Sequence, residues 1–333
     1  MKKQWFYKII SRFYIADIYT ALFLNKAYCA IVAYHRISPL WKDCLFPDIV
    51  VDPLKFESQI KYLRENYEII PLSHLESFFQ EKQSKKAKAA VITFDDGYGD
   101  NYTYALPILQ KYRVPATIFI STAFIETKRA FWWDILEFIL RKTNLTRLSF
   151  EYNNNKYIFN TDTRNKPKVF QQIANLLKYA DELTRENLLS LVSDLLQVKV
   201  SGLYPSILSW KQIEDMRHYN ICFGSHAHNH QRLVNLDEKK LTEELSLSKE
   251  LLENRLGQKV EDFAYPYGEK CDIEDKTKNM LSLSGYKRGL TMIQGHVLRD
   301  DDAFILRRIA ISGNDTIDSF KLKLKGMLPL RRK

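Results

Sequence analysis

The sequence predicts an α/β fold built on a distorted or incomplete barrel of about seven parallel strands, with a helical and hairpin insertion. Short apolar runs recur along the 333-residue chain, as they do in parallel strands that are buried on both faces. Helical patterns lie between most of these runs. This alternation indicates a parallel sheet or barrel, and the number and order of the runs favour a barrel.

The expected strands are seven apolar runs, each too short to be a typical helix. In chain order they are 30–34, 89–94, 116–120, 221–224, 262–265, 289–292 and 309–311. No repeat of fixed period and no long linker rich in Gly, Ser or Pro divides them. We therefore expect one main domain over residues 28–325.

Terminal signals mark three of the intervening helices. Asp52-Pro53 has the pattern of an N-cap followed by a first-turn proline, which opens a helix that continues through Leu63. The segment 209–212 has the spacing of a capping box and predicts a second helix start. A third helix is expected over 237–257, because its leucines share one side and a glycine ends it.

An insertion is expected between the third and fourth strands, at about residues 128–208. Two strand patterns, near 148–152 and 156–159, surround three consecutive asparagines and predict a hairpin. Two helical patterns follow, near 167–180 and 184–197. We expect this insertion to flank the functional site.

The two ends of the chain carry apolar and basic patterns. Residues 1–27 fit an amphipathic helix that suits either a membrane interface or packing on the domain. Charged residues interrupt this segment too often for a transmembrane helix, and it lacks the pattern of a cleavable signal peptide. Residues 326–333 form a basic tail. We expect a cytoplasmic protein, with peripheral attachment to the inner membrane as the alternative.

Charge and cysteine content exclude other classes of protein. The formal net charge is +10, but the basic clusters do not interleave base-stacking aromatics with a nucleic-acid motif, so we expect no nucleic-acid partner. The four cysteines lie far apart and form no C-x-x-C pair. Neither a zinc knuckle nor a disulfide framework is therefore indicated, and buried thiols in a reducing compartment are expected.

Acidic residues and histidines follow four of the expected strands, where a parallel barrel places its reactive groups. His35 follows the first run, Asp95-Asp96 the second, the segment 225–230 the fourth and Pro266-Tyr267 the fifth. Two adjacent carboxylates at the end of a buried strand repel one another unless a cation or a proton is present. A metal ion at this rim would satisfy them.

Two histidines complete the candidate metal site. His226 and His230 are four residues apart, so they share one face whether the segment is helical or extended, and His228 joins them only in an extended segment. Two imidazoles and one carboxylate suit a divalent metal, with zinc first and cobalt, nickel, manganese or iron as alternatives. Water activated there can attack a carbonyl group, with the second aspartate as base and backbone N–H groups near Tyr267 facing the oxyanion.

Three blocks together resemble the polysaccharide deacetylases of the nodulation-B homology class, carbohydrate esterase family four. They are Thr-Phe-Asp-Asp-Gly-Tyr at 93–98, Gly-Ser-His-Ala-His-Asn-His at 224–230 and Phe-Ala-Tyr-Pro-Tyr-Gly at 263–268. The resemblance covers most of the chain, and weaker similarities such as 33–37 and 131–134 are those of the bacterial surface-polysaccharide branch.

The resemblance implies a role for each matching residue. It makes Asp95 the general base, and it makes Asp96, His226 and His230 the ligands of the metal. It adds the Pro266-Tyr267 segment as the oxyanion-hole contributor, through the main chain of Tyr267. The resemblance thus implies a hydrolase that acts on carbon–nitrogen bonds other than peptide bonds.

The chain departs from the family pattern at two supporting positions. Many relatives place an arginine that orients the base two residues before the proline of the third block, where this chain has Ala264, and Arg308 is our candidate substitute. The late Leu-x-His motif that supplies a general acid has no clear match, so His35 or His296 is the candidate. Trp132 is either a core residue of the insertion or a platform for a sugar ring.

The leading expectation is removal of an N-acetyl group from a hexosamine of a bacterial surface polysaccharide or of its lipid-linked precursor. One alternative is a carbohydrate-binding or assembly protein on the same fold, because the usual arginine and late histidine are missing. Another is a metal hydrolase of an O-acetyl ester or of an amide in a non-sugar ring, because metal-activated water does not choose the bond. The sequence predicts no oligomeric state.

Overall fold

The computed structural model describes residues 27–40, 44–81, 87–203 and 206–327. The chain forms two compact units. The first comprises Met1–Pro39, Asp48–Glu126 and Ile207–Lys333, and the second comprises Leu40–Pro47 and Thr127–Ser206. The helix expected at 1–27 and most of the basic tail lie outside the described residues. Within the described ranges, no helix combines the length and the apolarity that a membrane crossing requires.

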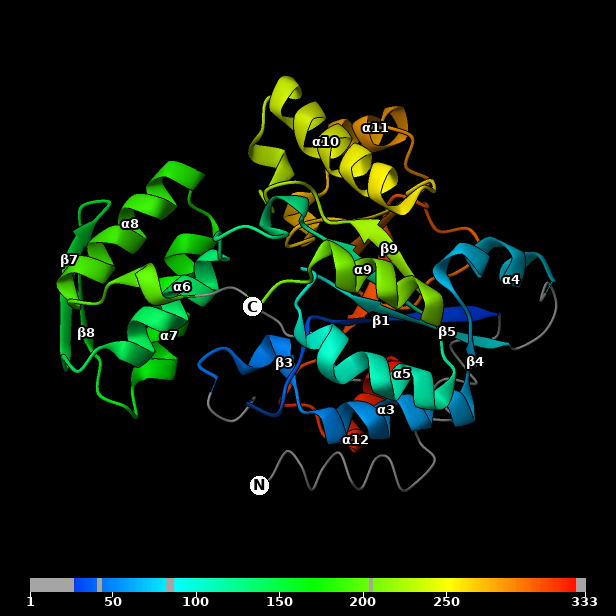
Figure 1. Ribbon diagram of the computed structural model, residues 1–333, viewed down its shortest axis with the longest axis horizontal. Coiled ribbons are helices and arrows are strands. Elements are labelled where there is room, and N and C mark those ends of the chain that lie inside the picture. The colour runs from blue at the N-terminus through cyan, green and yellow to red at the C-terminus, as the bar shows by residue number, and fades with distance from the viewer. Residues whose placement is uncertain (1–26, 41–43, 82–86, 204–205, 328–333) are drawn as a thin grey trace. The chain divides into compact units, whose positions relative to one another are not determined.

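Seven parallel strands close into a barrel in the first unit (Figure 1). They are β1 (Tyr28–Tyr34), β5 (Lys88–Phe94), β6 (Ala116–Ile120), β9 (Ile221–Ser225), β10 (Asp262–Ala264), β11 (Arg288–Gln294) and β12 (Leu306–Ala310). Around the barrel the order is β1-β12-β11-β10-β9-β6-β5, and β1 completes the ring by pairing with β5 along its whole length. The predicted barrel is confirmed, and it is closed rather than incomplete.

Short strands add to the barrel without interrupting it. β4 (Glu68–Ile69) pairs with the beginning of β5, while β6 pairs with the end of β5. β2 (Arg36–Ile37) and β3 (Val50–Val51) form a separate parallel pair. β12 begins earlier than the predicted run 309–311, because Arg307 and Arg308 interrupt an apolar pattern that starts at Leu306.

The barrel interior is apolar where the strands begin. Ile31, Val91 and Leu290 point inward, and they share a cluster with Phe78 and Phe79. These two phenylalanines belong to α4 (Leu75–Glu81), which follows β4. Alternate residues on the same strands, such as Val32 and Ile92, join a second cluster beneath the surrounding helices. Helix α4 therefore covers the end of the barrel at which the strands start.

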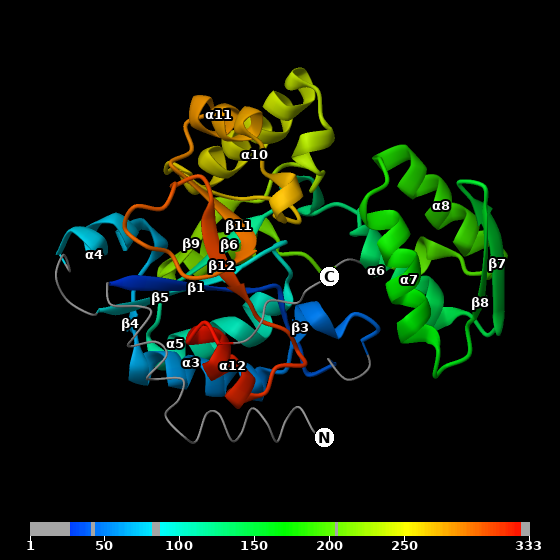
Figure 2. The same ribbon diagram turned by 180° about the vertical axis from the view of Figure 1, so that it is seen from behind.

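Helices of the first unit surround the barrel (Figures 1 and 2). They are α3 (Pro53–Asn66), α5 (Leu106–Tyr112), α9 (Trp210–Met216), α10 (Glu238–Leu256), α11 (Asp275–Leu283) and α12 (Ile317–Leu324). Helix α3 packs against α5 and α12, and α10 packs against α11. The three predicted helix signals are confirmed: Asp52 caps α3, Ser209 forms a capping box with Gln212 before α9, and Gly257 ends α10.

The second unit contains helices and one hairpin, drawn in green in Figure 1. Its elements are α6 (Trp132–Lys142), β7 (Arg147–Tyr152), β8 (Asn155–Asn160), α7 (Lys166–Lys178) and α8 (Glu182–Leu195). Asn153 and Asn154 both adopt positive φ, as a tight hairpin turn requires, so the predicted hairpin is confirmed. The segment Leu40–Pro47 also belongs to this unit, and its Phe46 packs on Phe170 of α7.

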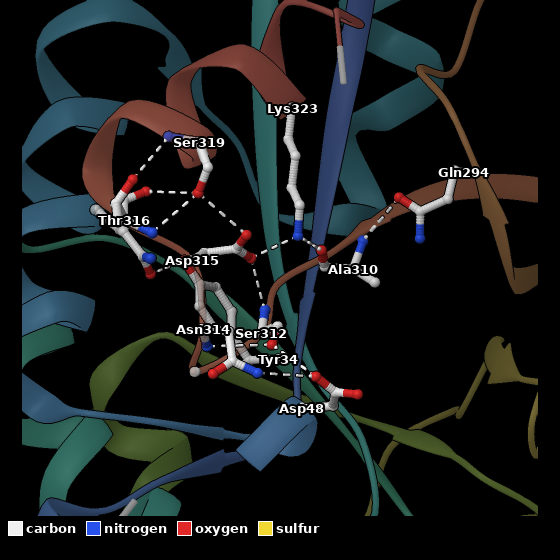
Figure 3. A network of polar contacts seen from close by, with 12 residues as sticks. Tyr34, Asp48, Gln294, Ala310, Ser312, Asn314, Asp315, Thr316, Ser319 and Lys323 are labelled. Carbon is white, nitrogen blue, oxygen red and sulfur yellow. Dashed lines mark hydrogen bonds and ion pairs between the residues drawn. The ribbon is translucent and has the colours of Figure 1, made fainter. Parts of the chain in front are cut away.

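A polar network fastens the loop between β12 and α12 (Figure 3). Asp315 accepts a hydrogen bond of 2.8 Å from the backbone N–H of Ser312 and forms an ion pair with Lys323. Asp48 accepts hydrogen bonds from Ser312 Oγ at 3.1 Å and from Asn314 Nδ2 at 3.2 Å. The network fixes the end of β12, and this strand carries Arg308.

Candidate active site

Five charged or titratable side chains gather at the end of the barrel where the strands finish. Asp95 and Asp96 follow β5, His226 and His230 lie in the loop after β9, and Arg308 is on β12. None of the five is more than 6% exposed. Because charges at such depth are costly unless they are compensated, each must have a partner nearby.

Asp95 is paired with Arg308. The guanidinium group donates two hydrogen bonds to the carboxylate, from Nη1 to Oδ1 at 2.8 Å and from Nη2 to Oδ2 at 2.7 Å. Arg308 Nε donates to the carbonyl oxygen of Thr291 at 2.8 Å, which fixes the plane of the guanidinium group. Burial alone would raise the pKa of Asp95, but the charges of Arg308 and His226 outweigh burial and lower this pKa. Asp95 is therefore an anion at neutral pH.

Asp96 faces the two histidines. Its Oδ1 lies 3.5 Å from Nε2 of His226 and 3.4 Å from Nε2 of His230. Among the residues that the structure describes, this buried oxygen has no hydrogen-bond partner. Burial would raise the pKa of Asp96, but the contacts with both histidines lower it.

These three residues fit a divalent metal. Their ligand atoms all lie within 4.8 Å of one another, and all three side chains are buried. One carboxylate oxygen and two imidazole nitrogens form a donor set that zinc and neighbouring transition metals favour. Among the described residues the carboxylate oxygen has no hydrogen-bond partner, so it is available to a metal. His226 Nδ1 lies 2.7 Å from the carbonyl oxygen of Ala264, and this contact directs Nε2 toward Asp96.

The loop that carries the histidines corrects one expectation. We expected the segment to be either helical or extended, but it is neither, because Ala227 and His230 adopt positive φ values of 62° and 56°. Asp96 is also left-handed, with a φ of 72°. Such conformations cost roughly 1–3 kcal/mol each and occur mainly where the surroundings enforce them, often at functional sites. His228 lies outside the ligand group, and its Nδ1 is 2.8 Å from Thr122 Oγ1.

Tyr267 lies beside the candidate metal site. Its ring is 5.1 Å from the ring of His230, and its backbone is left-handed with a φ of 60°. The carbonyl oxygen of Pro266 accepts a hydrogen bond of 2.7 Å from Gly268, which closes a tight turn around Tyr267. The structure thus brings the segment 266–267 next to the histidine loop.

A second acidic group near this turn already has a cation. Glu269, Cys271 and Asp272 offer ligand atoms close to one another. Arg232, however, forms a buried ion pair with Asp272 and packs 5.3 Å from the centre of the Tyr267 ring. Its guanidinium group supplies the positive charge there, so Asp96 and the two histidines remain the candidate metal site.

The two candidates for the general acid lie in different places. His35 follows the last residue of β1, and its electrostatic influence helps to lower the pKa of both Asp95 and Asp96. Its Nδ1 is buried and has no partner among the described residues. His35 therefore belongs to the cluster.

His296 does not, which corrects our second candidate for the acid. Its Nε2 is 2.8 Å from the carbonyl oxygen of Leu324, and its ring packs against Tyr28, the first residue of β1. A strand of this length spans roughly 20 Å, so His296 lies far from His35. The chain turns back after β11, and Val297 pairs with Cys29 near the start of β1.

Trp132 lies on α6 in the second unit. It is half-buried, and its ring packs edge-on against Trp133 with ring centres 5.3 Å apart. The guanidinium group of Arg185 lies 5.8 Å from the centre of its ring. Contact between Trp132 and a sugar stays a prediction.

One supporting pair near the site was not predicted from the sequence. Arg36, directly after His35, binds Asp100 through Nε at 2.8 Å and stacks its guanidinium group on Tyr98. The other oxygen of Asp100 accepts a hydrogen bond from the backbone of Ile37. Asp100 stands four residues after Asp96, so the pair ties the end of β1 to the turn after β5. The sequence signal that could have indicated this pair is the polar residue that follows each of the two strands.

Comparisons of sequence and structure show which known proteins this chain resembles. The polysaccharide deacetylase family model matches residues 82–289. YxkH of Bacillus subtilis, whose name places it among the polysaccharide deacetylases, is 22% identical over 89% of this chain and 76% of its own length. A poly-β-1,6-N-acetyl-D-glucosamine N-deacetylase of Staphylococcus aureus is 41% identical over 22% of this chain and 26% of its own length.

A solved structure shows the same fold. The deacetylase PplD of Streptococcus pyogenes, in complex with acetate, superimposes with a TM-score of 0.60 at 20% identity, over 89% of this chain and 98% of PplD. The matched family range holds Asp95, Asp96 and both candidate histidine ligands, while His35 and Arg308 lie outside it. Since that range covers more than half of the chain, the protein belongs to the polysaccharide deacetylase family, hydrolases of carbon–nitrogen bonds other than peptide bonds.

Proposed function

We propose that this deacetylase uses a divalent metal to remove the N-acetyl group from an N-acetylhexosamine of a bacterial surface polysaccharide or of its lipid-linked precursor. One observation carries the proposal. A buried oxygen of Asp96 that has no hydrogen-bond partner in the described part of the chain faces Nε2 of two histidines, and Arg308 holds the neighbouring Asp95 in a fixed orientation.

Asp95 is the proposed general base. Arg308 holds both carboxylate oxygens and keeps the group deprotonated, yet each oxygen retains a second lone pair. Asp95 can therefore accept a proton from water while its side chain stays fixed. Arg308 acts as the positioning residue for the base. The third block of this chain lacks such a residue, because Ala264 has no charged side chain.

Asp96, His226 and His230 are the proposed ligands, with zinc as the first choice of metal. A divalent cation held by these residues would supply Lewis-acid chemistry toward the amide carbonyl and would favour ionisation of the attacking water. A set of three protein ligands is typical of catalytic rather than structural zinc sites. The contact from Ala264 to His226 keeps one ligand aimed at this point.

His35 is the proposed general acid, and the main chain of Tyr267 is the proposed oxyanion contact. His35 follows β1 next to the two aspartates, so it can deliver a proton to the leaving amine. Tyr267 adjoins His230 and lies in a tight, left-handed turn, where a backbone N–H could face the oxyanion.

The substrate class is supported by the relatives and by the chemistry of the site. The Staphylococcus aureus relative is named for an N-acetylglucosamine polymer. The site offers the groups needed for amide hydrolysis: a base, a metal position and an acid.

The apolar and basic pattern of residues 1–27 supports a cytoplasmic protein bound to the inner membrane surface, where a lipid-linked glycan is found. Co-sedimentation with anionic vesicles, with and without these residues, tests that attachment.

Release of acetate from N-acetylglucosamine oligomers tests the function. We expect zinc-dependent release by the wild-type chain and essentially none by Asp95→Asn or His226→Ala. Equal release by both variants and the wild type would overturn the proposal. Oligomer binding without release would favour the binding-protein alternative, and release only from O-acetyl esters would favour the esterase. The contact of Arg308 with Asp95 removes one reason for the binding-protein alternative.

A further inference from the structure

The histidine loop is held in a conformation that it would not adopt alone. Two of its residues, Ala227 and His230, are left-handed without being glycine. On one side, Ser121 Oγ donates to the carbonyl oxygen of His226 at 2.9 Å, and Ala123 N–H donates to that of His228 at 2.9 Å. These contacts come from the end of β6 and the turn after it, and they hold carbonyl groups of the loop, whereas the backbone N–H groups of His228 and Asn229 are held from elsewhere.

A single carboxylate holds these two N–H groups. Glu244 lies on α10 and is only 5% exposed. Its Oε2 accepts hydrogen bonds from the backbone N–H of His228 at 3.0 Å and of Asn229 at 2.7 Å. Its Oε1 accepts one from Asn229 Nδ2 at 2.6 Å. Three donors from two consecutive residues therefore converge on one side chain, directly before His230.

The charge of Glu244 is a second distinctive feature. Among the described residues, no lysine, arginine or histidine side chain pairs with this buried carboxylate. A buried anion that only neutral donors hold is costly unless positive charge lies close by. Asp95 and Arg308 neutralise one another. Among the three proposed ligands only Asp96 is an anion, so a bound dication would keep an excess of positive charge. Glu244 supplies one further negative charge to the loop that carries two of the ligands.

We propose that Glu244 is a positioning residue of the metal site: it holds the histidine loop in its left-handed conformation, and its charge balances the bound cation. The inference rests on the proposed metal function. Hydrogen-bonding partners behind metal ligands orient them and adjust their basicity, and replacing such partners typically weakens metal binding about 10–100-fold.

Two substitutions separate the geometric role from the electrostatic one. Glu244→Gln keeps the size and an oxygen acceptor for the two backbone N–H groups, and the amide of Asn229 can rotate to accept from the new NH₂ group. It therefore removes mainly the charge. Glu244→Ala removes both the charge and the hydrogen bonds. We expect zinc to bind about 10-fold more weakly to Glu244→Gln and about 100-fold more weakly to Glu244→Ala.

Glu253 provides a matched control on the same helix. Its carboxylate also accepts a backbone hydrogen bond, from Val260 at 2.9 Å, but it serves the loop after α10 rather than the histidine loop. Glu253→Gln and Glu253→Ala should reduce thermal stability while leaving the affinity for zinc unchanged. A purely structural role for Glu244 would make the two pairs of variants behave alike.

The experiment measures zinc affinity by competition with a chromophoric chelator, and it measures the folding of each metal-free chain by circular dichroism. Wild-type affinity in Glu244→Gln would overturn the electrostatic role, and wild-type affinity in folded Glu244→Ala would overturn the geometric role. If Glu244→Ala does not fold, Glu244→Gln still decides the electrostatic role, and Asn229→Ala tests the part of the geometric role that depends on the side-chain hydrogen bond to Glu244. Absence of zinc binding by the wild type would instead reject the proposed metal function.

Discussion

Two of the buried arginine–aspartate pairs stand at opposite ends of the barrel, and one of these two belongs to the candidate active site. Arg308 binds Asp95 where the strands finish, and Arg288 binds Asp262 where β10 and β11 begin. Both arginines are at most 4% exposed. Residue type and burial therefore do not distinguish a catalytic pair from a structural one.

The surroundings of the two pairs shift the aspartate pKa values in opposite directions. Burial raises the pKa of Asp262, and Arg288 does not overcome it because Glu76 and Glu261 add negative charge nearby. Burial also opposes ionisation of Asp95, but Arg308 and the neighbouring histidines lower its pKa. Asp95 therefore stays ionised and is available to accept a proton. Asp262 instead shares Arg288 with Glu76, and this arginine attaches α4 to the barrel.

Metal removal should produce the largest difference between the two ends. A chelator should abolish acetate release and lower the melting temperature, because a ligand present at 100 times its dissociation constant stabilises the fold by about 2.7 kcal/mol. Adding zinc should restore both. Asp96→Ala should make the melting temperature insensitive to the chelator, whereas Asp262→Asn should leave that sensitivity intact. Calorimetry of the wild type and the two variants, each with and without chelator, checks this, and chelator sensitivity in Asp96→Ala would contradict the assigned ligand.

Neutralising each aspartate should give the next largest difference. Asp95→Asn removes the proposed base, so kcat should fall about 10²–10⁴-fold while zinc affinity stays close to that of the wild type. Asp262→Asn should retain most of kcat and change mainly the free energy of unfolding. Steady-state kinetics with metal analysis tests this pair. Comparable losses of kcat in both variants would show that the contrast between the two ends is not functional.

Replacing each arginine by lysine should have a smaller effect. Lysine keeps the charge but loses the planar, two-pronged contact, so Arg308→Lys should leave Asp95 ionised but poorly oriented. We expect kcat to fall about 10–100-fold with little change in KM. Arg288→Lys should instead lower the melting temperature and spare kcat. A normal kcat in Arg308→Lys would show that charge alone supports the base.

The smallest effect concerns pH. The folded-state pKa of Asp262 is raised, so folding favours its protonated form. Stability from this group is therefore greatest below the ordinary aspartate pKa and declines as the pH rises through the raised value, by about 1.4 kcal/mol per unit of pKa difference. Asp262→Asn should remove this decline. Urea unfolding of both chains from acidic to neutral pH measures it, and parallel curves would refute the shift.

The barrel was predictable because its strands are buried on both faces and therefore appear as apolar runs. The same rule explains the error at β12, where Arg307 and Arg308 interrupt the run while the backbone continues as a strand. Closure of the ring was not predictable, because it depends on the pairing of β1 with β5, far apart in the sequence. Helix α6 was missed although its aromatic start was noted.

The candidate site was predictable to the extent that its residues follow strands directly. Asp95, Asp96 and His226 do so, and they meet at one rim. The position of His230 depends on two left-handed residues, and one of them, Ala227, is not a type that signals this conformation. The sequence could not separate His296 from His35 as the candidate acid, because the reversal of the chain after β11 is not visible in it. Glu244 was missed because nothing in a helix sequence shows which loop its carboxylate will hold.

The second unit has a consequence for attempts to shorten the protein. It is assembled from two separate stretches, Leu40–Pro47 and Thr127–Ser206, so the chain passes between the units four times. Deleting the longer stretch alone would leave the shorter one without the unit to which it belongs. It would also expose Phe46, because its packing partner Phe170 would be gone. A minimal version of the enzyme, or a transfer of this unit to another barrel, must therefore exchange both stretches together.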